Sequence, residues 1–164
     1  KLTTMVLLPQ VCDAVNIPVI GAGGIADGRG IAAAFTLGAS AVQVGTRFLA
    51  SEECQIHQNY KNAVVKAKDI DTVVTGRSTG HPVQVIKNKL AKEYLKLENN
   101  NVNIEELEEL GKGALKKAVI DGDIDNGSLM AGQISGMVNK IQSVKEIIEE
   151  MFNEYDNIKC NFNS

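Results

Sequence analysis

The sequence predicts an α/β fold in which short parallel strands alternate with helices. Three observations favour it: two short β-branched strands, a glycine-containing turn directly after each strand, and helical spacing of apolar residues between them. A complete eight-stranded α/β barrel needs about 250 residues, and this chain has 164. The two recognisable strands therefore belong to part of a barrel at most.

The elements of the first third follow one another in a regular order. Apolar residues at helical spacing predict a helix over residues 3–15. The run 17–20 is short, apolar and β-branched, which is typical of a parallel strand covered on both faces. A glycine-rich turn over 21–28 leads into a helix through 31–37, and 41–44 is the second strand. The order is that of consecutive β/α units.

Polar residues and glycines mark where the helices begin and end. Asp27 is a good N-cap for the helix through 31–37, and Gly38 is a good residue to end it. Ser51 opens a helix that we expect to reach about residue 68. The remaining segments are a strand or loop over 71–85, helices over 84–97, 103–119, 129–138 and 143–155, a loop over 121–128, and an Asn-rich end. We accordingly expect β/α units in 1–70, a mainly helical subdomain in 71–156 and a frayed tail in 157–164.

Composition excludes several functional classes. Seventeen Lys and Arg against 20 Asp and Glu give a net charge of −3, so no basic excess favours nucleic acid as a partner. No apolar run approaches the ~20 residues that span a bilayer, and no signal segment follows Lys1, so we expect a cytoplasmic protein with no membrane partner. The three cysteines are an odd number at wide spacing, which argues against a disulfide framework. Cys54 and His57 have metal-ligand spacing but lack a second pair, so we expect no metal site.

The two glycine-containing turns predict a phosphate site. A phosphate needs several N–H donors that converge at low steric cost, and a glycine-rich turn that leads into a helix supplies them. Because the last two turns of a barrel commonly share one phosphate, Gly23, Gly24, Gly45 and Thr46 are the candidates.

Two other interpretations of these glycines remain open. The stretch 21–26 fits the loose dinucleotide pattern G-x-G-x-x-G/A, which requires an acidic residue about twenty positions later. Residues 43–46 occupy that place and contain no acid, so a shared phosphate is favoured. The glycines can also serve simply to turn the chain.

These residues also carry a family resemblance. The stretches 17–30 and 42–48 resemble the FMN-dependent nitronate monooxygenase superfamily. Later stretches are similar to the flavin-type bacterial enoyl-acyl-carrier-protein reductases, often called type II. They are 50–53, 68–72, 80–83, 86–88, 111–114 and 127–133.

The resemblance implies the carboxy-terminal part of a (β/α)8 TIM barrel, with its last two strand/helix units and an appended helical subdomain. It implies FMN as cofactor, with NADH or NADPH as hydride donor, in reducing enoyl-acyl-carrier-protein for fatty acid biosynthesis. The catalytic histidine of that family lies in a loop upstream of the stretch that matches Lys1, so no catalytic residue is assigned and this chain alone is expected to be inactive. The residues implied to hold the FMN phosphate are Gly23, Gly24, Gln43, Val44, Gly45 and Thr46.

Alternatives and partners follow from the same comparison. Nitronate oxidation on the same scaffold, a dehydrogenase of the inosine-monophosphate type, and an inert fragment that needs its complementary half are the competing interpretations. Acyl carrier protein is the implied partner, and we expect the intact protein to be a homodimer. Acyl carrier protein is acidic, so the basic stretch of four lysines in 87–96 is a candidate docking face, although a solvated helix face explains it as well.

Four single residues have competing roles. Arg47 can reach the phosphate or form a salt bridge beneath the sheet, and the second is favoured. Gln133 can line a flavin pocket or pack in a helix contact. His57 is expected to pack or lie on the surface, and His81 to bond to backbone in a turn rather than transfer protons.

Overall fold

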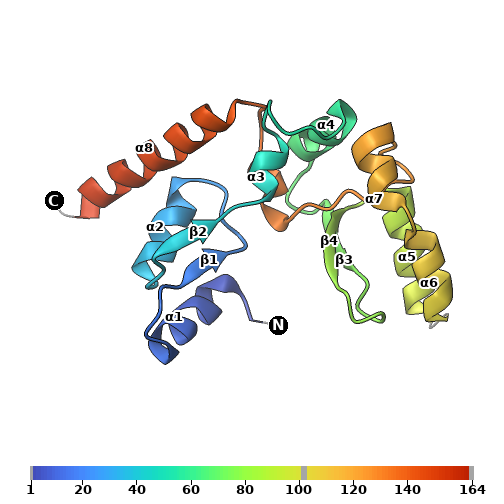
Figure 1. Ribbon diagram of the computed structural model, residues 1–164, viewed down its shortest axis with the longest axis horizontal. Coiled ribbons are helices and arrows are strands. Elements are labelled where there is room, and N and C mark those ends of the chain that lie inside the picture. The colour runs from blue at the N-terminus through green and yellow to red at the C-terminus, as the bar shows by residue number, and fades with distance from the viewer. Residues whose placement is uncertain (1, 101–102, 163–164) are drawn as a thin grey trace. The chain divides into compact units, whose positions relative to one another are not determined.

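A computed structural model describes residues 2–100 and 103–162 (Figure 1). The chain forms two compact units. Unit 1 comprises residues 1–53 and 142–164, and unit 2 comprises residues 54–141. The sequence predicted domains over 1–70 and 71–156, whereas the structure groups residues 54–70 with unit 2 and residues 142–156 with unit 1.

Unit 1 has the predicted α/β character. Its two strands pair in parallel, with Ile20 opposite Ala41 and Ala22 opposite Gln43. Helices precede, separate and follow the strands, as expected for consecutive β/α units. The elements are α1 (Thr4–Ala14), β1 (Ile20–Ala22), α2 (Gly28–Thr36), β2 (Ala41–Gln43), α3 (Thr46–Leu49) and α8 (Val144–Phe162).

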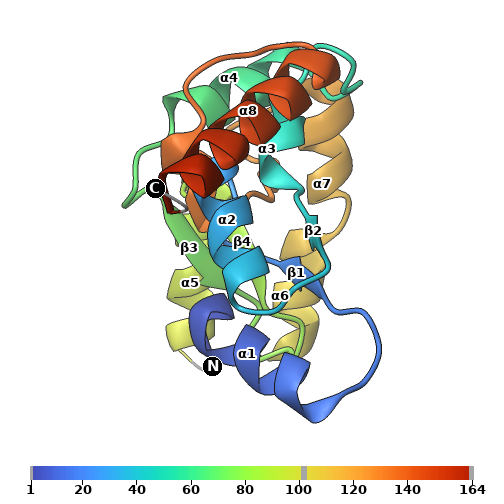
Figure 2. The same cartoon turned by 90° about the vertical axis from the view of Figure 1, so that its left-hand side faces the viewer.

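The core of unit 1 joins residues from both ends of the chain. Helix α8 packs along α2, which Figure 2 shows. Their approach is close at Gly28, where an added Cβ would lie 2.5 Å from the Met151 carbonyl oxygen and 2.5 Å from the Tyr155 nitrogen. A glycine is therefore required at this contact. The buried apolar residues of the cluster are Leu8, Ile25, Ile31, Ala34, Ala39, Ile147 and Met151.

The end of the chain is more ordered than the sequence suggests. Helix α8 continues through Phe162, so residues 157–162 are helical where a frayed tail was expected; residues 163–164 lie outside the described part. Tyr155 anchors the second half of α8 through an edge-on ring contact with Phe35 of α2, with centroids 5.3 Å apart, and it also contacts Phe152 of the same helix at 6.4 Å. Tertiary packing of this kind supplies most of the stability of a helix in a protein.

Helix α4 begins seven residues later than the sequence predicts. The segment expected to open it is held by the chain that precedes α8 instead. Ser51 bridges to Gln142, and the Glu53 carboxylate accepts the Val144 N–H at 2.9 and 3.0 Å. These long-range bonds outweigh the local helical preference, and α4 covers Gln58–Lys66.

Unit 2 contains a β-hairpin and a group of short helices. The hairpin strands are antiparallel, and Asn88 caps the helix that follows by accepting the Ala91 N–H at 2.9 Å. The helix expected over 84–97 thus begins only after the second strand has ended. The elements are α4, β3 (Thr72–Thr75), β4 (Val83–Ile86), α5 (Lys89–Asn99), α6 (Ile104–Gly111), α7 (Ala114–Lys116), the π-helical turn η1 (Lys117–Asp121) and the 3₁₀ turn η2 (Gln133–Met137).

The helix predicted over 129–138 is wrong in its first half. Residues 129–131 extend along β4: the Ile86 N–H donates to the Leu129 carbonyl at 2.9 Å, and the Ala131 N–H donates to the Gln84 carbonyl at 3.1 Å. The exposed edge of β4 offers backbone groups that need partners, and this segment satisfies them. In the described residues, no helix is long and apolar enough to cross a membrane.

Candidate functional site

The candidate site lies at the carboxyl ends of the two parallel strands. Because Ala22 pairs with Gln43, the residues that follow them, Gly23 and Val44, leave the sheet side by side. The register thus brings together the two turns from which the sequence predicts a shared site. Gln43, Gly23 and Gly24 are exposed, and Val44 is half-buried.

The first turn depends on glycine and on a bond from α1. Gly23 and Gly24 have φ of +90° and +79°, a conformation that L side chains rarely adopt. The Thr4 hydroxyl donates to the Gly23 carbonyl at 2.8 Å and lies 3.3 Å from the Ala22 carbonyl. Thr4 therefore fixes the turn from outside it. The sequence assigned Thr4 no role beyond a possible helix cap.

The second turn is open without being strained. Gly45 precedes α3 with φ −109° and ψ −66°, and nothing lies within 4 Å of the position that its Cβ would occupy. The same open space surrounds Gly24. Among the described residues, no backbone hydrogen bond outside the helices and strands uses the N–H of Gly24 or Gly45. These amides can therefore donate hydrogen bonds to an anion, and Thr46 continues the turn as the first residue of α3.

The amino-terminal end of α2 is already occupied. The Gly28 N–H donates to a Glu154 carboxylate oxygen at 2.8 Å, and the Gly30 N–H donates to Asp27 at 3.1 Å. The Asp27 cap was predicted, but the donation to Glu154 spans 126 residues and has no local signal. Two carboxylates would repel a phosphate here. An anion at this edge of the sheet would therefore have to be held by the amides of the two turns, which are the candidates that the sequence predicts, without the amino-terminal end of α2.

Side chains of the protein itself bind both arginines of this region. Arg29 pairs with Asp27 and, at 3.6 Å, with Glu154. Arg47 is 8% exposed and hydrogen-bonds to the Gln142 side chain, whose amide donates to Glu150 at 2.7 Å. A phosphate between the turns would therefore be held mainly by backbone N–H groups.

Burial also affects the Arg47 guanidinium. It lowers the pKa of Arg47 from its ordinary value, while the charge of Glu150 opposes the shift. Its Nη1 is buried without a hydrogen-bond partner among the described residues. Arg47 thus joins α3 to the segment that precedes α8, through a hydrogen bond to the Gln142 amide where the sequence predicted a salt bridge.

The other residues singled out from the sequence lie in unit 2. His57 caps α4, where its Nδ1 accepts the Asn59 N–H at 3.1 Å, and the described residues contain no group of three potential metal ligands. Gln133 begins η2. His81 is exposed between β3 and β4. None of these residues belongs to the two turns of unit 1.

Known proteins resemble the whole length of this chain. The family model described as nitronate monooxygenase matches residues 1–154. A probable nitronate monooxygenase of Staphylococcus saprophyticus is 37% identical over 155 residues, which are 94% of this chain and 43% of that protein. Among solved structures, FabK from Thermotoga maritima is 47% identical with a TM-score of 0.95, covering 99% of this chain and 52% of that one. A nitroalkane oxidase from Streptomyces ansochromogenes is 29% identical with a TM-score of 0.80, covering 98% of this chain and 46% of that one. The chain spans about half the length of these proteins.

Proposed function

Because the chain belongs to the nitronate monooxygenase family, we propose that it supplies the FMN-phosphate site of a flavin-dependent oxidoreductase. The family and FabK are flavoproteins that use FMN. The observation that carries the proposal is the parallel register, which sets two turns with open glycine amides beside each other. The residues proposed to hold the phosphate are Gly23, Gly24, Gln43, Val44, Gly45 and Thr46.

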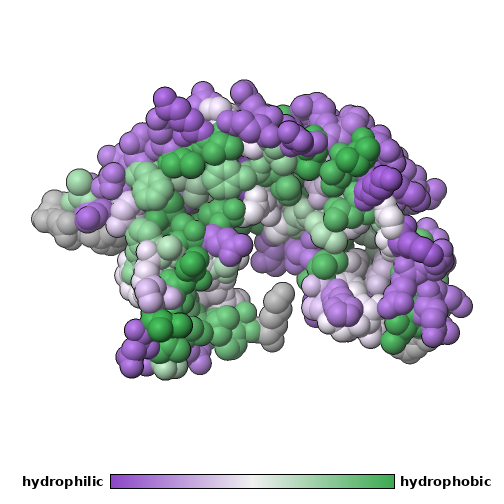
Figure 3. Space-filling view, viewed as in Figure 1, coloured by the Kyte–Doolittle hydropathy of each residue, from purple (hydrophilic) through white to green (hydrophobic). Residues whose placement is uncertain are grey.

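We infer that the two β/α units of unit 1 are the last two of a TIM barrel. FabK is a TIM-barrel enzyme, and this chain matches about half of it. Exposed apolar residues at the sheet support the inference. Ile20, the first residue of β1, is 60% exposed, although strands of parallel sheets are normally covered on both faces, and Ile17 in the segment before it is 71% exposed. Figure 3 shows apolar residues reaching the visible surface over unit 1. Further barrel strands would cover them.

The contribution of this chain is to bind and orient FMN. FMN, when bound, supplies hydride transfer between a nicotinamide nucleotide and the substrate. The turn amides would neutralise its phosphate, and Thr4 would hold the first turn in place. Both histidines, His57 and His81, lie in unit 2 and are assigned no catalytic role.

Reduction of enoyl-acyl-carrier-protein with NADH or NADPH is the reaction that we favour. FabK is an enoyl-ACP reductase of type II, and its 47% identity with this chain exceeds the 37% of the probable nitronate monooxygenase. Oxidation of alkyl nitronates is the second candidate, because the family model and the nitroalkane oxidase favour it.

Flavin binding tests the phosphate site directly. The chain is titrated with FMN and, in parallel, with riboflavin, and the quenching of flavin fluorescence is recorded. Hydrogen bonds to a charged group contribute about 1.5–3 kcal/mol each, so FMN should bind at least tenfold more tightly than riboflavin. Equal affinity for the two flavins would show that the turns hold no phosphate.

The two reactions are distinguished with the chain alone and mixed with the amino-terminal half of FabK. A reductase oxidises NADH or NADPH when given a trans-2-enoyl thioester. A nitronate monooxygenase consumes oxygen when given an alkyl nitronate and does not respond to the thioester. Oxygen consumption without thioester reduction would replace the favoured reaction by the second candidate.

We propose acyl carrier protein as the partner, and helix α5 as the surface that meets it. Lys89, Lys92 and Lys96 are exposed, and their spacing places them on one face of α5; Lys87 precedes the helix. Replacing all four lysines by glutamate should raise the KM for carrier-bound substrate and leave the KM for a carrier-free thioester unchanged. An unchanged KM for the carrier-bound substrate would exclude this docking face. Formation of a homodimer by the intact protein remains part of the proposal.

A further inference from the structure

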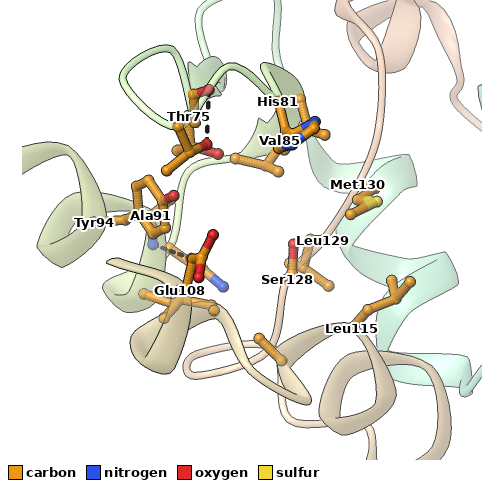
Figure 4. A pocket seen from close by; sticks show the side chains of 17 residues that line it. Thr75, His81, Val85, Ala91, Tyr94, Glu108, Leu115, Ser128, Leu129 and Met130 are labelled. Carbon is orange, nitrogen blue, oxygen red and sulfur yellow. Dashed lines mark hydrogen bonds between the residues drawn. The ribbon is translucent and has the colours of Figure 1, made fainter. Parts of the chain in front are cut away.

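Unit 2 contains a cavity that the phosphate site does not use. It has a volume of about 290 Å³ and opens between the β3–β4 hairpin, α5, the end of α6 and residues 128–130 (Figure 4). All residues that line it belong to unit 2. Well-packed domains contain few voids much larger than a water molecule, so a cavity of this size in a small unit indicates room for a ligand.

The inner wall of the cavity is aliphatic. Val85, Ala91, Ala114 and Leu129 are each at most 4% exposed and line it. Small residues from α5 and α7 give it depth, and two rings, Tyr94 and His81, also contribute to the lining. The buried part of the wall suits a flexible apolar chain, because the side chains that form it are aliphatic.

Two of the polar residues in the lining already have structural partners. The Asn88 side chain caps α5 and donates to the Ile124 and Gly127 carbonyls at 2.8 and 2.7 Å. The Thr79 hydroxyl donates to the Gly76 carbonyl at 3.1 Å. Their hydrogen-bonding capacity is spent on the fold, so they add little polarity to the cavity.

Tyr94 and Glu108 differ from these two residues. Figure 4 shows both on one side of the cavity, across from His81 and Met130. Within the part of the chain that the structure describes, no hydrogen bond is formed by the Tyr94 hydroxyl or the Glu108 carboxylate. The hydroxyl can donate to a carbonyl oxygen, whereas the carboxylate repels a second carboxylate. Because Glu108 is exposed, solvent screens its charge and the repulsion is modest, so the Tyr94 hydroxyl, as a donor to a carbonyl oxygen, is the stronger indication of a neutral carbonyl compound.

We propose that this cavity binds the aliphatic chain of an acyl thioester. A methylene group has nearly the volume of a water molecule, about 30 Å³, so 290 Å³ holds a chain on the order of ten carbon atoms. That the ligand is aliphatic follows from the lining. That it is an acyl thioester rests on the proposed enoyl reductase function.

Chain length provides the first test. The 164-residue chain is titrated by calorimetry with butanoyl, octanoyl, decanoyl and hexadecanoyl thioesters of N-acetylcysteamine, and with free decanoic acid. Each buried methylene should tighten binding roughly three- to fourfold, until the cavity is full near the decanoyl chain. Decanoic acid should bind a few-fold more weakly than the thioester, because the exposed Glu108 carboxylate repels it by about 1 kcal/mol at most. Affinity that does not depend on chain length, or no binding at all, would overturn the proposal.

Gly111 offers a variant that fills the cavity without disturbing the fold. Its added Cβ would meet nothing nearer than the Tyr94 ring at 3.9 Å, which is an ordinary contact. Gly111→Leu should weaken decanoyl thioester binding tenfold or more and butanoyl thioester binding much less. The control is Lys112→Leu, which adds the same side chain at the next exposed position outside the cavity. Equal decanoyl affinity in the two variants would place the ligand elsewhere.

FMN titration of the same samples separates this inference from the proposed function. Loss of chain-length dependence with FMN binding intact would overturn the acyl cavity and leave the phosphate site standing. Chain-length-dependent binding in a protein that binds no FMN would support the cavity and overturn the proposed function.

Discussion

The replacement Gly45→Leu tests the phosphate site with the least disturbance of the fold. Gly45 has a negative φ of −109°, so a leucine can adopt its backbone conformation without strain. The space around its Cβ position is empty to 4 Å. The added side chain therefore occupies the room above the second turn and displaces nothing that the protein itself places there.

The expected effect can be estimated from the bond that is lost. A phosphate oxygen bonded to the Gly45 nitrogen at about 2.9 Å would lie within reach of a side chain on the same residue. Losing one hydrogen bond to a charged group costs about 1.5–3 kcal/mol, which corresponds to roughly 10- to 150-fold in Kd. The melting temperature should not change, because no protein contact is broken.

Fluorescence titration with FMN and riboflavin, together with thermal unfolding, measures both quantities. Gly45→Leu should weaken the binding of FMN and leave riboflavin binding nearly unchanged, since riboflavin has no phosphate. Lys112→Leu, an exposed replacement in unit 2, is the control for nonspecific effects of an added leucine. Unaltered FMN affinity in a folded Gly45→Leu protein would refute the idea that this turn holds the phosphate.

Three further predictions follow from contacts elsewhere. Gly28→Ala places a Cβ 2.5 Å from the backbone of α8, so it should lower the stability of unit 1 by about 1–3 kcal/mol in urea unfolding; wild-type stability would contradict the close contact. Thr4→Val removes the 2.8 Å bond to Gly23, worth about 0.5–1.5 kcal/mol, and should weaken FMN binding by up to tenfold, whereas unchanged affinity would show that the turn holds itself. Burial raises the pKa of Tyr60 to about 12. The stability that its neutral form provides is therefore complete below about pH 10 and is lost as the pH rises through the raised value. Tyr60→Phe should remove the phenolate absorbance step near pH 12, and a step at the ordinary tyrosine pKa would contradict the burial.

The strands and turns of unit 1 were predictable because their signals are local. Runs of β-branched residues followed by glycines define β1 and β2 to within a few residues, and Asp27 caps α2 as expected. The parallel direction of the strands follows from the β/α order, and the register that the structure adds brings Gly23 beside Val44. The fold class and the candidate phosphate residues could therefore be predicted without knowing any contact between distant parts of the chain.

The features that sequence reasoning missed depend on contacts distant in the chain. Glu154 occupies the end of α2 from 126 residues away, and no pattern near Gly28 announces it. Residues 129–131 pair with β4 because that strand has an edge to satisfy, although their own composition favours a helix. The cavity of unit 2 is lined from five separate segments, so its existence depends on tertiary packing that periodicity does not encode.

The order in which the chain is made gives α8 a particular importance. Unit 2 is continuous from residue 54 to 141, whereas the apolar cluster of unit 1 includes Ile147 and Met151. During synthesis, the interior segment has all of its own residues available before unit 1 can close its core. Until α8 emerges, the apolar residues of α2 that will contact it face solvent, so this is a stage of synthesis at which unit 1 is exposed to aggregation.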